Sequence, residues 1–191
     1  MHLRTVLLFS GKRKSGKDYI TNKLVDTCPG DYEILKISYP IKNHFAKEKK
    51  LNMDQLLSSD KYKETYRMEM IKWSEEMRDK DYGCFCRAAC DAEKLTWVVS
   101  DIRRKTDIQW FKENYGNIVR TIRIICDEST RVDRGYTFTP GVDDAASECD
   151  LDDYEGWDLI VDNGCNREDW SSQMNSICKL MDSCIANNDS R

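Results

Sequence analysis

The sequence is poor in the residues and motifs on which hydrolytic enzymes depend. Its 191 residues include two histidines, His2 and His44, and neither lies near a nucleophilic serine or cysteine in a recognised pattern. Neither the Gly-x-Ser-x-Gly motif nor the His-Glu-x-x-His motif occurs. The sequence therefore offers no machinery for serine-hydrolase or zinc-protease chemistry of these types.

Long apolar segments are also lacking. No run approaches the roughly 20 residues that a membrane-spanning helix needs. Residues 1–4 lead directly into a strand-like segment rather than into a secretory signal. The C-terminal Asp189-Ser190-Arg191 differs from the Ser-Lys-Leu of a peroxisomal address. We therefore expect a cytosolic protein that binds no membrane, and the C-terminal residues do not support a peroxisomal location.

The nine cysteines do not form an obvious disulfide framework. Their number is odd and they are scattered along the chain, which favours reduced thiols of an intracellular protein. The tightest group, Cys84, Cys86 and Cys90, has no second pair at zinc spacing. We expect these three residues to share a helix face rather than to bind a metal.

A loop rich in glycine and lysine is the most informative feature present. Residues 11–18 read Gly-Lys-Arg-Lys-Ser-Gly-Lys-Asp, between an apolar strand-like run and a helical segment. In that setting Gly11 and Gly16 let the backbone amides curl around a phosphate, and the helix N-terminus adds partial positive charge. Lys17 can reach the β- and γ-phosphates. The pattern predicts a P-loop that binds ATP or GTP.

Two departures make this loop unusual. Asp18 stands where a serine or threonine normally offers its hydroxyl to magnesium, and we expect its carboxylate to help hold Mg²⁺ instead. Lys12, Arg13 and Lys14 add three cations inside the loop. Because the whole chain carries a net charge of −4, this concentrated positive charge favours a small polyanion over nucleic acid.

Strand-like and helical segments alternate along the chain, which predicts an α/β fold with a mostly parallel sheet. The strands are expected at 5–9, 33–38, 96–100, 119–126 and 157–161. We expect one domain, divided into a core (about 1–59, 95–130 and 156–191), a helical substrate-binding insert (about 60–94) and a mobile lid (about 131–155).

Charged residues follow the third predicted strand, at the sheet edge where α/β proteins bind ligands. Asp101 could hold magnesium through water, and Arg103 and Arg104 suit a phosphate because the guanidinium fork binds two oxygens at once. A surface turn with locally paired arginines is the alternative.

The insert presents a second group of cations. Lys63, Arg67, Ser74 and Arg78 have helical spacing and share one face, whereas an apolar stripe on the opposing side is expected to enter the core. A solvated basic face is the alternative reading of this pattern. Lys42, close to the start of the helix after the second strand, is a comparable candidate.

Late segments add weaker candidates. Arg131 and Arg134 lie three residues apart and could reach ATP phosphates from a closing lid. Asn163 follows the last strand and could touch a ligand, although a plain turn is equally plausible; Gln173 carries less signal. Residues 143–155 hold seven carboxylates and no cation, without the glycine of a calcium loop. A solvated lid or hinge is the expectation for that run.

Several of these stretches together resemble the animal-type phosphomevalonate kinases. The resemblance covers about residues 5–185 and is carried by residues 7–18, Val99-Ser100-Asp101 with Arg103-Arg104, residues 107–111, residues 138–145 and Ser147-Glu148-Cys149. It implies a P-loop fold like that of nucleoside monophosphate kinases, a three-layer sandwich. It also implies transfer of the ATP γ-phosphoryl group to (R)-5-phosphomevalonate, with Mg²⁺, in the mevalonate route to isoprenoids and sterols.

The resemblance also assigns roles to positions of this sequence. The implied catalytic residues are Arg13, Lys14, Lys17 and Asp18. The implied ATP-binding residues are Gly11, Lys12, Arg13, Lys14, Ser15, Gly16, Lys17, Asp18, Arg134 and Gln173. The implied acceptor-binding residues are Lys42, Lys63, Arg67, Arg78, Arg103, Arg104 and Asn163. Magnesium would be held by Asp18 and Asp101.

Two other functions stay open at this stage. A nucleoside or deoxynucleoside monophosphate kinase would share the loop, the lid and the arginines, and a nucleotide-binding regulator without catalysis is suggested by Asp18 alone. In every case we expect small-molecule ligands and a monomer, since no segment indicates an obligate interface.

Overall fold

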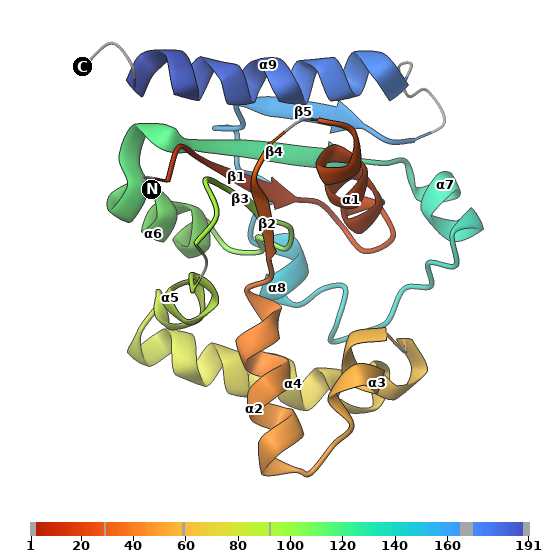
Figure 1. The fold of residues 1–191 in the computed structure, drawn as a ribbon. Helices are drawn as coiled ribbons and strands as arrows, with labels where there is room; N and C mark the ends of the chain where they lie inside the picture. The colour runs from red at the N-terminus through yellow and green to blue at the C-terminus, as the bar shows by residue number, and fades with distance from the viewer. Residues whose placement is uncertain (1–2, 29, 59, 92, 165–169, 189–191) are drawn as a thin grey trace.

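A five-stranded parallel sheet organises the part of the chain that the structure describes. The computed structural model describes residues 3–28, 30–58, 60–91, 93–164 and 170–188. The sheet has the order β2-β3-β1-β4-β5, and all four neighbouring pairs are parallel (Figure 1). The strands are β1 (Thr5–Ser10), β2 (Tyr32–Leu35), β3 (Thr96–Val99), β4 (Val119–Ile125) and β5 (Leu159–Asp162). The predicted α/β class is confirmed.

The sheet separates two apolar cores because side chains alternate along each strand. On β1, Leu7 and Phe9 face a core shared with α1 (Lys17–Thr27) and α9 (Trp170–Asn188). Val6 and Leu8 face a core shared with α5 (Cys84–Ala89) and α6 (Lys105–Tyr115). All six residues of β1 are buried, as expected for a central strand covered on both faces. The result is a three-layer sandwich.

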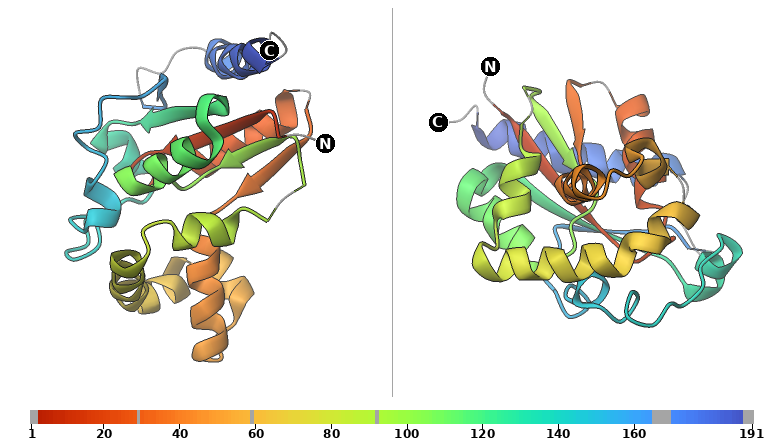
Figure 2. Two further views of the ribbon diagram at one scale, coloured as in Figure 1. Left: turned by 90° about the vertical axis from the view of Figure 1, so that its left-hand side faces the viewer. Right: turned by 90° about the horizontal axis from the view of Figure 1, so that it is seen from below.

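The helical insert is larger than the sequence predicts. The predicted insert begins at residue 60, but α2 (Ser38–Glu48) and α3 (Met53–Ser58) already pack against α4 (Asp60–Lys80). Together with α5, these helices lie on the side of the sheet opposite α9 (Figures 1 and 2). The second strand also ends earlier than predicted, at Leu35, because α2 begins at Ser38.

The late segment returns across the sheet edge with little regular structure. After η1 (Gly116–Ile118) and β4, the chain forms α7 (Glu128–Asp133) and then α8 (Ala146–Cys149) before β5. Asp127 caps α7, because its side chain accepts a hydrogen bond from the Thr130 amide at 2.7 Å. We call residues 143–153 the acidic strap; it includes α8.

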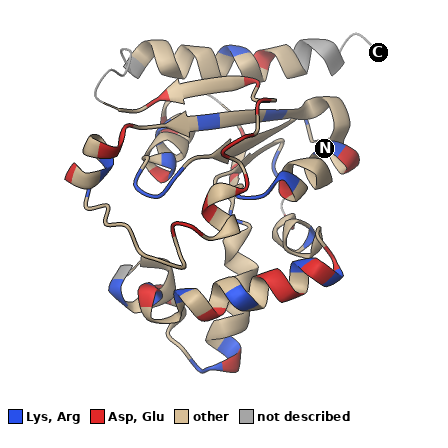
Figure 3. Cartoon of the chain, turned by 180° about the vertical axis from the view of Figure 1, so that it is seen from behind, with Lys and Arg blue, Asp and Glu red and all other residues tan. Residues whose placement is uncertain are grey.

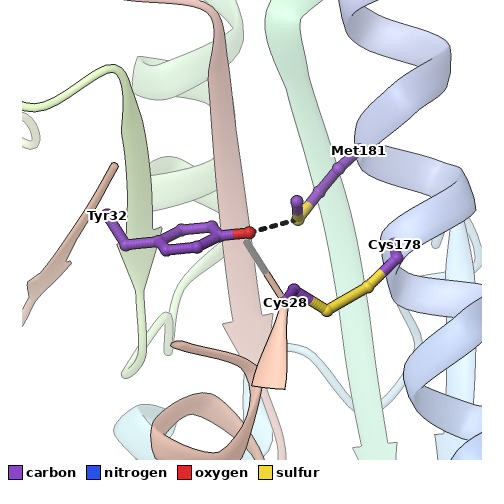
Figure 4. The surroundings of a disulfide bond; sticks show 4 residues. All are labelled: Cys28, Tyr32, Cys178 and Met181. Carbon is purple, nitrogen blue, oxygen red and sulfur yellow. Dashed lines mark hydrogen bonds between the residues drawn. A yellow bond between two sulfur atoms is a disulfide. The ribbon is translucent and has the colours of Figure 1, made fainter. Parts of the chain in front are cut away.

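One disulfide contradicts the expectation that all cysteines are reduced. Cys28, just beyond the end of α1, is bonded to Cys178 on α9, and Met181 and Tyr32 lie beside the pair (Figure 4). The two cysteines are 150 residues apart in sequence. They meet because α1 and α9 cover the same face of the sheet, which no local spacing reveals. Six further described cysteines are free thiols.

No helix of the described residues is long and apolar enough to cross a membrane. The C-terminal residues 189–191, on which the peroxisomal expectation depends, lie outside the described part of the chain.

Candidate active site

A large cavity opens where the carboxyl ends of the strands meet the helical insert. Its volume is about 760 Å³. Most of the predicted site residues line it: Arg13, Lys14, Gly16, Lys17, Asp18, Lys42, Lys63, Arg67, Arg78, Asp101, Arg103, Arg104 and Arg134. Gly11, Lys12, Ser15, Asn163 and Gln173 do not. The sheet edge and the insert therefore bring together residues from opposite ends of the sequence in one basic pocket.

The P-loop has a backbone that its glycines make possible. Gly16 has a φ of 91° at the start of α1, and Lys14 has a φ of 61° within the loop. A Cβ at Gly11 would lie 2.6 Å from the carbonyl oxygen of Ile124, so the loop can pass close to β4 only without a side chain there. The loop therefore leads directly into the N-terminus of α1, the place where helices commonly bind anions.

Lys17 lies folded back over the loop that precedes it. Its ammonium donates hydrogen bonds to the carbonyl oxygens of Gly11 and Lys12. Burial, with a further contribution from the nearby Arg103 charge, lowers the pKa of Lys17 to about 8. An approaching polyphosphate would raise the pKa of Lys17 again, because the phosphate charge favours the protonated ammonium.

Asp18 faces the same cavity, with its side chain 72% exposed. Burial opposes ionisation of this carboxylate, but the hydrogen bond and charge of Lys36 and the charge of Lys17 dominate, so its pKa is lowered. Lys36 donates to the Asp18 Oδ1 at 2.9 Å. The carboxylate is therefore ionised and open to the cavity.

Asp101 has a structural task at the same edge. Its two carboxylate oxygens accept the backbone amides of Ile37 and Ser38 at 2.6 and 3.0 Å, which satisfies amides at the start of α2. It still lines the cavity. Among the described residues, no group of three or more His, Cys, Asp or Glu side chains is arranged to hold a metal.

The acidic strap pairs with the loop cations. The Lys12 ammonium donates to Asp152 at 2.6 Å and to the Glu148 carbonyl oxygen at 2.7 Å, so it points away from the cavity. Arg13 donates to Asp143 at 2.8 Å. In Figure 3 the acidic segments of the strap and the basic loops lie in the same region, between the sheet and the insert. Three of the seven carboxylates, Asp143, Glu148 and Asp152, are thus ion-paired with site residues, whereas Asp144, Asp153 and Glu155 are exposed.

The arginines after β3 form the cationic wall opposite the P-loop. Arg103 is paired with Glu148 from the strap, and Arg104 with Glu75 from α4. Arg104 is only 6% exposed, and its Nη1 has no hydrogen-bond partner in the described structure. A buried guanidinium nitrogen without an acceptor is costly, and this one belongs to a residue that lines the cavity.

The α4 face supplies the remaining cations, as the helical spacing predicted. Lys63, Arg67, Ser74 and Arg78 all line the cavity. Arg78 reaches the core, where its Nη1 donates to Asp107 at 2.5 Å. Across from them, burial and the neighbouring Lys63 charge lower the pKa of Lys42 to about 8, although Asp101 opposes the shift.

Two of the three late candidates, Asn163 and Arg134, support the P-loop from behind. Asn163 is 2% exposed, and its side-chain amide donates to the Ser15 carbonyl oxygen at 2.8 Å. Arg134 donates to the carbonyl oxygens of Ser15 and Asn163 at 3.2 and 2.8 Å while still lining the cavity. Gln173 is buried against the Asp162 carbonyl oxygen. Asn163 and Gln173 thus lie outside the cavity wall.

Sequence reasoning gave no role to three carboxylates and one lysine that organise the site. Lys36 immediately follows β2, and this position at the end of a strand could have identified it as a candidate site residue. Glu148 and Asp107 lie inside stretches that carry the family resemblance, but the arginine side chains that they pair with are 45 and 29 residues away in sequence. Glu64 bonds Arg67 at 2.6 Å and also approaches Arg13 at 3.5 Å.

Comparisons with known proteins agree with this geometry. The family model of phosphomevalonate kinase matches residues 9–117. A phosphomevalonate kinase of Drosophila melanogaster is 47% identical over 165 residues, which is 83% of this chain and 87% of the relative.

Solved structures are similar at the level of the fold. Protein TT1252 from Thermus thermophilus has a TM-score of 0.52 at 12% identity and covers 96% of this chain and 98% of its own. The APS kinase CysC of Mycobacterium tuberculosis has a TM-score of 0.49 at 14% identity, covering 95% and 99%.

Proposed function

This chain belongs to the phosphomevalonate kinase family, and from that premise we propose how its pocket carries out the reaction. The enzyme transfers the γ-phosphoryl group of ATP to (R)-5-phosphomevalonate, giving ADP and (R)-5-diphosphomevalonate. ATP lies on the P-loop side of the cavity, and the acceptor lies between the α4 face and the arginines after β3. The family comparisons favour this acceptor over the nucleotide acceptors considered from the sequence, and over a regulator without catalysis.

The single observation that carries the acceptor assignment is the unpartnered Nη1 of Arg104. Arg104 lines the cavity together with Arg103 and Arg78, and this nitrogen is buried and unpartnered. A phosphate offers oxygens to several guanidinium groups at once, which would satisfy the free donor and neutralise the wall. A neutral acceptor could accept a hydrogen bond from this donor but would add no negative charge beside the three arginines.

The ATP side is supported by the loop backbone and by Lys17. Amides of the loop and of the first turn of α1 bind the phosphate chain, and Lys17 is released from its two carbonyl contacts to reach the β- and γ-phosphates. Arg134 holds the loop from the lid side while facing the cavity. Arg13 and Lys14 add positive charge at the place where negative charge gathers during transfer.

Magnesium fits the residues present at this edge. Asp18 offers an ionised carboxylate open to the cavity, and Asp101 keeps lone pairs that can hold a magnesium-bound water. When bound, the ion would neutralise phosphate charge. In the proposal Asp18 is the principal protein ligand, and Asp101 acts through water while it caps α2.

The chemistry needs no general base from the protein. The acceptor oxygen belongs to a phosphate whose second pKa is about 6, so it is largely dianionic at neutral pH and attacks the γ-phosphorus without losing a proton. The main obstacle is repulsion: two unit charges 4 Å apart cost about 4 kcal/mol at an effective dielectric constant of 20. Lys42, Lys63 and Arg67 line the cavity on the acceptor side and reduce this repulsion.

We also propose that the enzyme acts in the cytosol as a monomer on these small-molecule substrates. Six of the eight described cysteines are free thiols, which is typical of a reducing compartment, and the other two form the Cys28–Cys178 disulfide. Light scattering during size-exclusion chromatography, with and without reductant, measures the mass in solution. A stable dimer would contradict this part of the proposal.

The test of the function is an ADP-release assay with matched variants. The enzyme should release ADP with phosphomevalonate and not with AMP, dTMP or no acceptor. Arg104→Gln should raise KM for phosphomevalonate about 10- to 100-fold, because it removes hydrogen bonds between charged groups, and should change KM for ATP little. The control is Arg87→Gln, an exposed arginine on α5 that does not line the cavity. Equal ADP release with AMP, or an unchanged KM in Arg104→Gln, would overturn the acceptor assignment.

A further inference from the structure

One fully buried carboxylate lies behind the arginines that are proposed to bind the acceptor. Asp107, in the first turn of α6, has an exposed fraction of 0%. It does not line the cavity. An isolated charge at such a place would be strongly unfavourable, so its partners determine what it does.

The two oxygens of Asp107 have different partners. Oδ2 accepts the backbone amides of Arg103 and Arg104 at 3.1 and 3.0 Å. Oδ1 accepts the Arg78 Nη1 at 2.5 Å and lies 3.6 Å from the Cys86 thiol. One oxygen therefore fixes the backbone of the turn after β3, and the other fixes a side chain that comes from α4.

This arrangement joins the core of the domain to its helical insert at the acceptor side. Arg78 belongs to α4, whereas Arg103 and Arg104 follow β3, and all three line the same cavity. The Arg103 and Arg104 guanidinium groups have their own carboxylate partners, Glu148 and Glu75, whereas Asp107 is the ion-pair partner of Arg78. Asp107 therefore compensates Arg78 from the protein side and fixes the backbone that carries the other two arginines.

We propose that Asp107 is a positioning residue that sets Arg78, Arg103 and Arg104 in place for the acceptor phosphate before the substrate arrives. This inference rests on the proposed function and adds a residue to it. The benefit of such an arrangement is that the donors already point at the phosphate, so little reorganisation is needed on binding.

A purely structural role is the competing explanation. Asp107 lies near the helix N-terminus and accepts two amides there, which by itself stabilises α6. Loss of stability alone lowers the amount of folded enzyme and leaves both Michaelis constants unchanged. Loss of positioning raises KM for phosphomevalonate in the molecules that are folded. Measurements of KM therefore separate the two roles.

The decisive variant is Asp107→Asn, which keeps the size of the side chain and removes its charge. We expect KM for phosphomevalonate to rise about 10- to 100-fold, with KM for ATP changed less than about twofold. Phe111→Leu is the matched control, because Phe111 is fully buried on the same helix but packs into the apolar core. It should lower the melting temperature and leave both KM values unchanged.

Two further variants keep the test conclusive. If Asp107→Asn does not accumulate as folded protein, Asp107→Glu retains the charge and displaces it by one methylene, and it should show the same selective rise in KM. In a double-mutant cycle with Arg78→Lys, the effects on KM for phosphomevalonate should combine to less than their product, because both changes disturb one contact.

Unchanged KM for phosphomevalonate in both Asp107 variants, or equal rises in both Michaelis constants, would overturn the positioning role. That outcome differs from failure of the proposed function. If the function itself is wrong, the unmodified enzyme shows no phosphomevalonate-dependent ADP release. If only this inference is wrong, Arg104→Gln still raises KM while Asp107→Asn does not.

Discussion

The depressed pKa of Lys17 predicts that ATP affinity falls as the pH rises through 8. The pKa of Lys17 is lowered from 10.5 to about 8 chiefly by burial, so the free enzyme holds a protonated Lys17 in about nine-tenths of molecules at pH 7 and about one-tenth at pH 9. If only the protonated form binds MgATP, the apparent Kd should be about tenfold weaker at pH 9 than at pH 7. The sign follows because a bound polyanion favours the charged ammonium.

Isothermal titration calorimetry without acceptor is the suitable assay, since it gives Kd and proton uptake together. At pH 8, with half of the molecules neutral at Lys17, binding should take up about half a proton per ATP at this site. Repeating the titration in buffers of different ionisation enthalpy measures that number. Ionic strength is held constant, because exposed charges are screened by salt.

Two variants assign the effect to one residue. Lys17→Arg keeps a positive charge that does not titrate in this range, and it should remove the pH dependence and the proton uptake. Lys42 also has a pKa of about 8 but lies on the acceptor side, so Lys42→Arg should leave the ATP titration unchanged. A Kd that is flat between pH 7 and 9, or a decline that persists in Lys17→Arg, would refute the reasoning.

Two other predictions concern carboxylates that face the cavity. The charge of Glu148 raises the pKa of Lys17, so Glu148→Gln should move the midpoint of the curve of ATP affinity against pH below pH 8. Calorimetry measures this midpoint. A midpoint that does not move would contradict the electrostatic coupling between Glu148 and Lys17. Asp18→Asn should raise the magnesium concentration for half-maximal rate about tenfold or more. It should also change the free energy of unfolding by less than about 1 kcal/mol, because its pair with Lys36 is exposed. An unchanged magnesium requirement would remove Asp18 from the metal site.

Features that depend on local pattern could be predicted from the sequence. The P-loop was predictable because its spacing is set by the backbone path around one phosphate. The shared face of Lys63, Arg67 and Arg78 was predictable because helical geometry fixes it over about four turns. The parallel sheet followed from the alternation of strands and helices, and with it the meeting of the loops at one edge.

Features that depend on distant pairing could not be predicted in the same way. Glu148 meets Arg103 across 45 residues, and Cys28 meets Cys178 across 150. Asn163 looked like a ligand contact because it follows a strand, but the polypeptide there turns so that its amide holds the Ser15 carbonyl instead. Which side chain at a strand end faces the cavity is decided by tertiary packing, which local spacing does not encode.

The acidic strap explains how the cations of a site for two phosphorylated ligands can lie close together when neither ligand is bound. Its carboxylates pair with Lys12, Arg13 and Arg103, so the positive charge of the pocket is already partly compensated by the protein. The cations that a ligand phosphate meets are therefore already paired with carboxylates of the protein. The free energy gained when the phosphate binds is smaller than the sum of its Coulomb interactions with unpaired cations. The same compensation limits how tightly the more highly charged product is held. A run of seven carboxylates and a run of four cations, 130 residues apart, are thus two halves of one electrostatic arrangement.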